Sequence, residues 1–109
     1  GFSYIRQGKY DIALSFFEAL VVLDPTNVYD AQTLGAIYLE INKPAQAMQQ
    51  FDRALKLEPN HGPTLLNVAK TFFMLGKKQE GLKIVQVLKK NPDSQISNIA
   101  KALILAYSS

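Results

Sequence analysis

The stretch AQTLGAIYLEINKPAQAMQQFDRALKLEP, residues 31–59, decides the fold because its pattern recurs on both sides of it. When the stretch is shifted back by thirty-four residues, small residues fall on small ones and aromatic residues on aromatic ones: Gly35 on Gly1, Tyr38 on Tyr4, Ala47 on Ala13, Phe51 on Phe17 and Pro59 on Pro25. The forward shift pairs Leu34 with Val68, Gly35 with Ala69, Tyr38 with Phe72, Asn42 with Gly76, Ala47 with Gly81 and Phe51 with Val85. A fixed period of this length indicates stacked structural repeats.

A thirty-four-residue period with these small and aromatic positions is typical of the tetratricopeptide repeat (TPR), a helix-turn-helix unit. We therefore expect an all-α fold, a right-handed α-α superhelix of three TPR units, the first one truncated, plus a C-terminal capping helix. The expected single TPR domain covers residues 1–109, with units at about 1–27, 28–61 and 62–92 and the capping helix at 93–107. Because Gly1 matches the eighth position of the repeat, we expect the natural protein to extend further towards its N-terminus.

Composition agrees with one globular domain and excludes several kinds of chemistry. The 109 residues include 48% hydrophobic ones without a long apolar run, so we expect no membrane insertion. With zero cysteines there are no disulfides and no thiolate metal ligands. The net charge of +3 is mild, and we expect no nucleic-acid partner. The lysines of the third unit are interpreted as a solvated convex face: Lys77, Lys78, Lys83, Lys89 and Lys90.

Local signals place the helices within each unit. We call the first helix of each unit its A-helix and the second its B-helix. We expect Gly8 to end the tail of a first A-helix and residues 10–23 to form a B-helix. The buried stripe of that B-helix is predicted to consist of Ala13, Phe16, Phe17, Leu20 and Leu23. Further helices are expected at 28–41, from Pro44 to about 57, from about Pro63 to Gly76, and from Asp93 or Ser94 to 107. Gly81 is expected where a neighbouring helix approaches closely.

The sequence offers little to catalyse a reaction. His61 is the only histidine, lies in a predicted turn without a ligand-spaced neighbour, and is interpreted as a solvated turn residue. The acidic residues are scattered singly, and the glycines occupy repeat positions rather than a phosphate-binding loop. We expect no enzyme, no cofactor and no metal site.

On the A-helix at 28–41, the packing arc that is expected to contact the B-helices consists of Ala31, Leu34, Gly35 and Tyr38. Each A-helix has a second arc beside it, which lines the concave surface in a stacked solenoid. Those apolar positions can equally belong to an ordinary core, because apolar residues at helical spacing usually do. We favour a groove for an extended or helical peptide, since the packing arc is already apolar. Its predicted peptide-binding residues are Phe2, Ile5, Arg6, Tyr29, Gln32, Ala36, Leu39, Glu40, Leu66, Lys70, Phe73 and Met74.

The repeated positions resemble TPR proteins over nearly the whole chain, and that resemblance implies peptide binding without catalysis. One TPR subgroup holds the acidic C-terminal tails of heat-shock chaperones through lysine, asparagine and arginine on the A-helices. This sequence has Thr33, Pro63 and Asn67 at three of those positions, with Gln32 and Ala36 where lysine and asparagine are sought. That carboxylate clamp is therefore absent.

A narrower resemblance is to the TPR chaperones of bacterial type III secretion, which hold translocator proteins before export. The chain is similar to them in its number of repeats, its extra C-terminal helix, and the motifs Gly8-Lys9-Tyr10, Leu34-Gly35-Ala36-Ile37-Tyr38 and Pro63. Asp24-Pro25 and Glu58-Pro59 are closer to generic repeats. The resemblance implies a bacterial cytoplasmic chaperone that holds an apolar client segment. The alternative is a generic scaffold or co-chaperone module that joins subunits of an assembly.

Oligomeric state follows from the same resemblance only as an open expectation. The chaperone family often dimerises through an N-terminal helical arm, and this sequence does not contain that arm. A homodimer through such a segment is therefore one expectation, beside a protein client or peptide as the partner of the concave groove.

Overall fold

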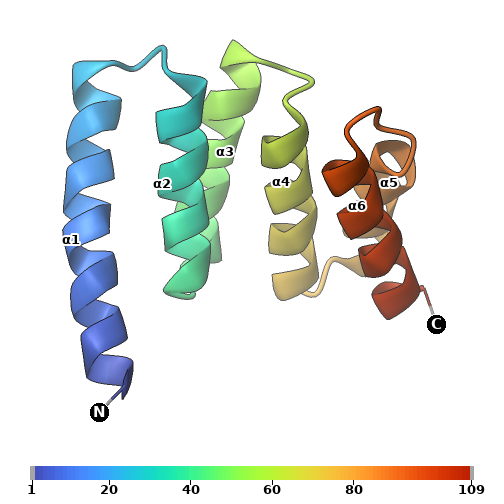
Figure 1. Cartoon of the computed structure of the whole chain (residues 1–109), viewed down its shortest axis with the longest axis horizontal. Coiled ribbons are helices and arrows are strands. Elements are labelled where there is room, and N and C mark those ends of the chain that lie inside the picture. Colours follow the sequence, from blue (N-terminus) through green and yellow to red (C-terminus); the bar gives the residue numbers. More distant parts are fainter. Residues whose placement is uncertain (1, 109) are drawn as a thin grey trace. The chain divides into compact units, whose positions relative to one another are not determined.

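The computed structural model describes the backbone of residues 2–108 and the side chains of residues 9–108, and over that range every regular element is an α-helix. The helices are α1 (Phe2–Leu23), α2 (Val28–Glu40), α3 (Pro44–Leu57), α4 (Gly62–Met74), α5 (Lys78–Leu88) and α6 (Ser94–Tyr107), as Figure 1 shows. The expected all-α fold of TPR type is confirmed. The helices form two compact units, the first ending at Pro59 and the second beginning at Asn60. The repeat boundaries and the single-domain organisation stay predictions.

Side chains next to the helix starts explain why these segments are helical. The Asn27 side chain accepts a hydrogen bond from the Asp30 backbone N–H at 3.1 Å and caps α2. Pro44 lies in the first turn of α3, where its missing N–H leaves no hydrogen bond unmade. Asp93 caps α6 by accepting from the backbone N–H groups of Gln95 and Ile96. The sequence predicted all three starts.

The turn between the paired helices is the same in both units. Asn42 follows α2 with φ of 61°, and Gly76, its equivalent one period later, follows α4 with φ of 76°. The next residue in each turn closes it, because Lys43 N–H donates to the Tyr38 carbonyl and Lys77 N–H to the Phe72 carbonyl, each at 2.8 Å. A residue of positive φ, followed by a residue whose N–H bonds to the carbonyl five positions earlier, is a recurrent way for a helix to end. The period is therefore visible in the backbone.

The core of the first unit lies between α2 and its neighbours α1 and α3 (Figure 1). Val28, Ala31 and Ala54 form a buried apolar cluster. Phe51 of α3 is fully buried, and its ring lies directly over Gly35 of α2, where a Cβ atom would overlap the ring. Glycine at this position thus lets the two helices approach closely.

Two tyrosine hydroxyls connect α1 to α2 in the same unit. Tyr38 on α2 donates a hydrogen bond to the Glu18 carboxylate on α1 at 2.9 Å. Tyr10 on α1 donates to the Glu40 carboxylate on α2 at 3.5 Å. The pair is reciprocal, with one donor and one acceptor on each helix, so it favours one register of α1 against α2.

The core of the second unit joins α4, α5 and α6. Its buried cluster consists of Leu66, Ala69, Val85, Leu88 and Ala100, with Ile96, Leu103 and Ile104 packed against it from α6. The Ser97 hydroxyl donates to the Lys89 carbonyl at 2.8 Å and fastens the start of α6 to the end of α5. α6 therefore completes this core.

The structure corrects the prediction for the first helix. α1 is one continuous helix, so Gly8 lies inside it instead of ending a separate A-helix. A glycine in a helix costs only about 1 kcal/mol relative to alanine, which neighbouring helical residues can offset. Phe16 and Leu23 are 59% and 80% exposed, so they do not belong to the buried stripe. The stripe was misassigned because α1 carries two apolar faces, and spacing alone does not say which one is buried.

Two further expectations differ in detail. The apolar spacing of the last helix predicts that Ile99 faces inward, but its side chain is 41% exposed. Gly81 does lie at a close approach, but it is the Phe73 ring of α4 that fills the space: a Cβ on Gly81 would be 2.6 Å from Phe73 Cε1. Among the described helices, none is both long and apolar enough to cross a membrane.

Candidate functional site

Five of the predicted peptide-binding residues form what we call the α2 surface: Tyr29, Gln32, Ala36, Leu39 and Glu40. Their spacing of three, four and seven residues places them along one side of the helix. Tyr29 is 67% exposed, Glu40 is exposed, and the three residues between them are half-buried. The Tyr10 hydroxyl donates to Glu40, which fixes the acidic end of the surface. The α2 surface therefore combines an aromatic side chain, a shallow apolar middle and hydrogen-bonding groups at Gln32 and Glu40.

The four predicted residues of the second unit, which we call the α4 surface, divide into two kinds. Met74 is 47% exposed and Lys70 is half-buried, so both offer contact surface. Leu66 is only 6% exposed and belongs to the buried cluster of the unit. It supports the α4 surface from beneath.

Phe73, which was predicted to bind peptide, also packs within its own unit. Its ring covers Gly81 on α5 and stacks on Tyr107 of α6, with centroids 4.0 Å apart and planes inclined by 2°. Phe73 remains half-buried, so one part of the ring is committed to packing and the rest faces outward. Its spacing on α4 could not reveal this, because both contacts come from other helices.

Three predicted residues, Phe2, Ile5 and Arg6, lie outside the described side chains. The structure places their backbone within α1. Their part in binding stays a prediction.

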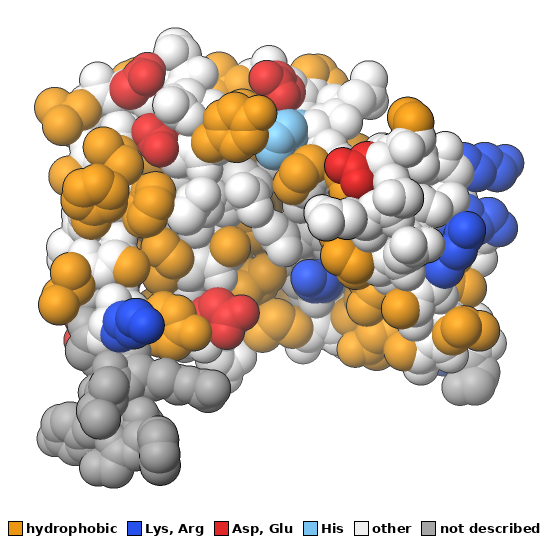
Figure 2. Space-filling model, viewed as in Figure 1, with side chains coloured by type: hydrophobic (Ala, Val, Ile, Leu, Met, Phe, Trp, Pro, Cys, Tyr) orange, Lys and Arg blue, Asp and Glu red, His pale blue; other side chains and the backbone are white. Residues whose placement is uncertain are grey.

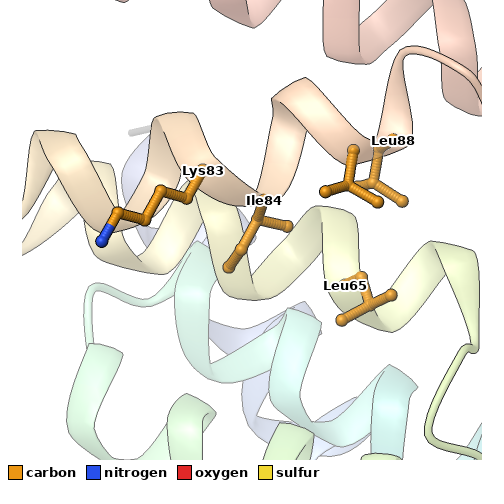
Figure 3. A pocket seen from close by; sticks show the side chains of 5 residues that line it. Leu65, Lys83, Ile84 and Leu88 are labelled. Carbon is orange, nitrogen blue, oxygen red and sulfur yellow. The ribbon is translucent and has the colours of Figure 1, made fainter.

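A pocket in the second unit was not predicted from the sequence. Its cavity of about 230 Å³ is lined by Leu65 of α4 and by Lys83, Ile84, Val87 and Leu88 of α5. Figure 3 shows the Lys83 nitrogen pointing away from Leu65 and Leu88. The lining is almost wholly apolar, with Lys83 as its one cationic residue. The signal that could have revealed it is the pair Ile84 and Val87 among the charged residues of a face that we interpreted as solvated.

One tyrosine at the α1–α2 contact, Tyr38, has a raised pKa. Burial raises the pKa of Tyr38, and its hydrogen bond to Glu18 and the negative charge of that carboxylate raise it further. All three causes favour the neutral phenol. The hydroxyl therefore remains a donor to Glu18 throughout the physiological pH range.

His61 is more engaged than the predicted solvated turn residue. It is half-buried at the start of α4, and its Nδ1 lies 2.7 Å from the Thr64 hydroxyl, which is fully buried. This contact makes His61 a structural residue of the helix start. Among the described residues, no group of three or more histidine or carboxylate side chains could hold a metal ion.

Paired helices with a recurring turn, a glycine beneath an aromatic ring and a third helix closing the second core define a tetratricopeptide-type helical repeat protein. Residues 6–88 match the family model described as anaphase-promoting complex, cyclosome, subunit 3. The chain belongs to this TPR-type family.

Solved structures with the same fold include a bacterial secretion chaperone and a TPR domain bound to an HSP90 peptide. The type III secretion chaperone SycD of Yersinia enterocolitica, in complex with a peptide of the translocator YopD, has a TM-score of 0.81 at 19% identity, covering 98% of this chain and 86% of that one. The first TPR of Spaghetti (RPAP3), bound to the HSP90 peptide SRMEEVD, has a TM-score of 0.77 at 25% identity over 98% of this chain and 86% of that one. The resemblance to type III secretion chaperones is thus supported at the level of the fold.

Curated relatives are long proteins. The human PEX5-related protein is 26% identical over 93 residues, which are 84% of this chain and 15% of the relative. The co-chaperone DNJ1 of Fusarium oxysporum, described as containing tetratricopeptide repeats and a J domain, is 26% identical over 62% of this chain and 13% of its own length. The chain therefore spans well under one fifth of these relatives.

Proposed function

We propose that this chain is a non-catalytic peptide-binding domain that acts as a type III secretion chaperone in the bacterial cytoplasm. Its client is an apolar segment of a translocator or another secreted protein, held in the concave groove predicted from the A-helices. The observation that carries the proposal is the α2 surface, where Tyr29 is largely exposed at the end of a shallow apolar row. The fold shared with a chaperone that was solved with a translocator peptide supports the same function.

The chemistry of the two surfaces suits an extended segment. Aromatic and thioether side chains such as Tyr29 and Met74 cover apolar anchors without demanding one shape. Gln32 and Lys70 can bond to the backbone of a bound peptide, whose N–H and C=O groups would otherwise lose water without compensation. Binding through the backbone with a few apolar anchors is a general mode for holding unfolded segments.

The second candidate is a scaffold or co-chaperone module in a larger assembly. It is favoured by the similarity to the RPAP3 repeat that was solved with an HSP90 peptide. In this chain, however, Gln32 and Ala36 stand where the carboxylate clamp needs lysine and asparagine. The two candidates therefore predict different ligands.

A peptide-binding experiment separates them. We would select extended peptides against the purified chain by phage display and measure their affinity by calorimetry, with the HSP90 peptide SRMEEVD as the comparison ligand. The secretion-chaperone proposal predicts selected peptides with spaced apolar anchors and no measurable binding of SRMEEVD. Binding of SRMEEVD in place of apolar peptides would support the co-chaperone candidate.

Point variants test the surfaces themselves. Tyr29→Asp or Met74→Asp should weaken the selected peptide at least about tenfold, because a buried anchor typically contributes at least 1–2 kcal/mol. Both residues are exposed in the free protein, so circular dichroism should remain unchanged. Leu105→Asp, at an exposed apolar residue of α6, is the matched control and should bind normally. Binding that is lost in Lys83→Asp and retained in the two surface variants would move the site to the α5 pocket.

A further inference from the structure

The α5 pocket is separate from the surfaces that are proposed to bind a client. Its lining residues are Leu65, Lys83, Ile84, Val87 and Leu88, and none of them belongs to the α2 or α4 surface. Val87 is 72% exposed and Lys83 is exposed, so a partner can reach the pocket from solvent. The Lys83 nitrogen points away from Leu65 and Leu88 (Figure 3), which leaves the interior of the pocket apolar.

The size of the α5 pocket fits one large side chain. Its cavity of about 230 Å³ is smaller than the roughly 300–1,000 Å³ of sites that enclose small-molecule ligands. An apolar cavity of about 150 Å³ can hold a benzene ring, so the α5 pocket has room for one aromatic side chain. A single anchor residue of a protein partner therefore suits the pocket better than a cofactor does.

The repeat does not require an apolar surface at this place. One period before Ile84 and Val87, α3 has Gln50 and Arg53. Single exposed apolar residues are common on proteins, but Val87 adjoins the half-buried Ile84 and lines a cavity with it. The difference between the equivalent helices indicates that this side of α5 contacts a partner.

Positive charge surrounds the pocket and indicates the charge of that partner. Residues 60–109 contain seven lysines and two carboxylates, whereas residues 1–59 contain five cationic and seven acidic residues. Figure 2 shows Lys and Arg side chains gathered over α5 and α6, at the right of the view. Residues 77–90, which comprise α5 and the turns beside it, carry one carboxylate, Glu80, and five of the lysines: Lys77, Lys78, Lys83, Lys89 and Lys90. Complementary charge steers and orients an acidic partner on such a surface.

Two of these lysines lie on either side of the pocket residue Val87. Lys83, Val87 and Lys90 are separated by four and three positions, so they share one side of the helix. Lys90 continues the last turn, because its N–H donates to the Val87 carbonyl at 3.2 Å. Both lysines are exposed. A segment with its anchor in the pocket would therefore place the residues before and after the anchor near these two cations.

An acidic protein segment fits this surface better than the other anionic partners do. Nucleic-acid strands are held by aromatic rings on which bases stack, and α5 has no aromatic residue. A membrane surface is bound by a broad apolar helix face, but Val87 is the only large apolar residue of α5 that is exposed. We propose that the α5 pocket docks an acidic segment of a partner protein, with one aromatic anchor in the cavity and carboxylates beside Lys83 and Lys90. This docking is independent of what the α2 and α4 surfaces bind.

Three matched peptides test the proposal in NMR titrations of the ¹⁵N-labelled chain: EDEFEDE, EDEAEDE without the aromatic anchor, and QNQFQNQ without the charge. EDEFEDE should shift the amides of α5 around Lys83 and Val87 and that of Leu65, and should leave those near Tyr29 on α2 unchanged. The other two peptides should bind at least about tenfold more weakly, because each lacks one of the two kinds of contact. The HSP90 peptide SRMEEVD has no aromatic anchor and should not occupy the pocket.

Two variants test the residues of the pocket. Val87→Asp and Lys83→Glu should each weaken EDEFEDE at least about fivefold, because they bring a carboxylate beside those of the peptide. Both positions are exposed, so circular dichroism should not change. Lys101→Glu, at an exposed lysine of α6, makes the same change in net charge and should bind EDEFEDE almost as the parent does. An apolar-anchored peptide selected for the α2 and α4 surfaces should bind all three variants normally.

Several results would overturn the proposal. They are the absence of shifts on α5 at millimolar EDEFEDE, equal affinity for EDEFEDE and EDEAEDE, and unchanged binding of EDEFEDE by Val87→Asp. Tighter binding of oligothymidine or of phosphatidylserine vesicles than of EDEFEDE would assign the lysines to that partner instead. Since EDEFEDE is titrated without the selected apolar peptide, failure of this proposal and failure of client binding by the α2 and α4 surfaces are observed separately.

Discussion

Each of the two units has a contact in which an aromatic ring of one helix lies over a glycine of the next, but the ring comes from opposite helices of the pair. In the first unit the small residue is Gly35 on α2 and the ring is Phe51 on α3. In the second unit the small residue is Gly81 on α5 and the ring is Phe73 on α4. The two contacts do not lie at equivalent positions, because one period after Gly35 and Phe51 come Ala69 and Val85. The backbone turn is shared, so the repeat preserves the path of the chain while the place of the largest ring changes.

Removal of α6 should have the largest effect, and it should affect the second unit more than the first. Deleting residues 95–109 exposes Leu66, Val85 and Leu88, which α6 covers in the second unit. We expect the second unit to lose cooperative unfolding or to aggregate, because terminal helices shield the last apolar layer of a repeat stack. Amide NMR spectra should still show dispersed signals from the first unit. A soluble truncation with unchanged thermal unfolding would make α6 an accessory helix.

The second prediction compares the two aromatic rings. Phe51→Ala should destabilise the protein by about 3–5 kcal/mol, because the ring is fully buried and leaves a cavity. Phe73→Ala should cost clearly less, since Phe73 is only half-buried. Urea unfolding followed by circular dichroism gives both values. Equal losses would mean that the two contacts are energetically alike in spite of their different burial.

The third prediction tests whether the Phe73 ring and Gly81 fit each other in volume. Gly81→Leu should cost about 1–3 kcal/mol by overpacking against the Phe73 ring. Phe73→Leu recreates the leucine found at Leu39 in the first unit and frees space beside position 81. The double variant should therefore lose less free energy of unfolding than the two single variants lose together. A double-mutant cycle measures this difference. Simple additivity would show that residues 73 and 81 do not compensate each other.

The smallest effect concerns a contact that only the first unit has. Tyr38→Phe removes the bond to Glu18 and should cost about 0.5–1 kcal/mol at neutral pH. Because folding raises the pKa of Tyr38, the folded protein holds the phenolic proton more tightly than the unfolded chain does. This contribution is complete below the ordinary tyrosine pKa of about 10 and is lost as the pH rises through the folded value.

Unfolding measured from pH 8 to 11 should therefore bring the parent and Tyr38→Phe closer together. Tyr10→Phe, which removes the longer bond to Glu40, serves as the comparison. A difference between parent and Tyr38→Phe that grows above pH 10 would contradict the assigned causes.

Local chemistry explains which parts of the fold the sequence could predict. The starts of α2, α3 and α6 depend on Asn27, Pro44 and Asp93, whose effects reach only a few residues. The shared turn at Asn42 and Gly76 follows from the period and from the tolerance of these residues for positive φ. These features need no knowledge of distant contacts.

The errors arose where tertiary contacts decide the outcome. Phe16 and Phe17 are neighbours on α1, yet Phe16 is exposed and Phe17 half-buried, because α1 has apolar residues on two sides. Phe73 has the spacing of a groove residue, but Gly81 and Tyr107 from other helices hold its ring. Among the predicted peptide-binding residues, Tyr29 and Met74 are exposed and Leu66 is buried, and the part of each in binding stays a prediction.

An NMR titration of the ¹⁵N-labelled chain with a selected apolar-anchored peptide tests the central claim most directly. The account predicts that the largest amide shifts occur on α2 near Tyr29 and Ala36 and on α4 near Lys70 and Met74, and that Tyr29→Asp reduces them. Shifts confined to α5 around Lys83 and Val87, or no shifts at saturating peptide, would contradict peptide binding by these surfaces.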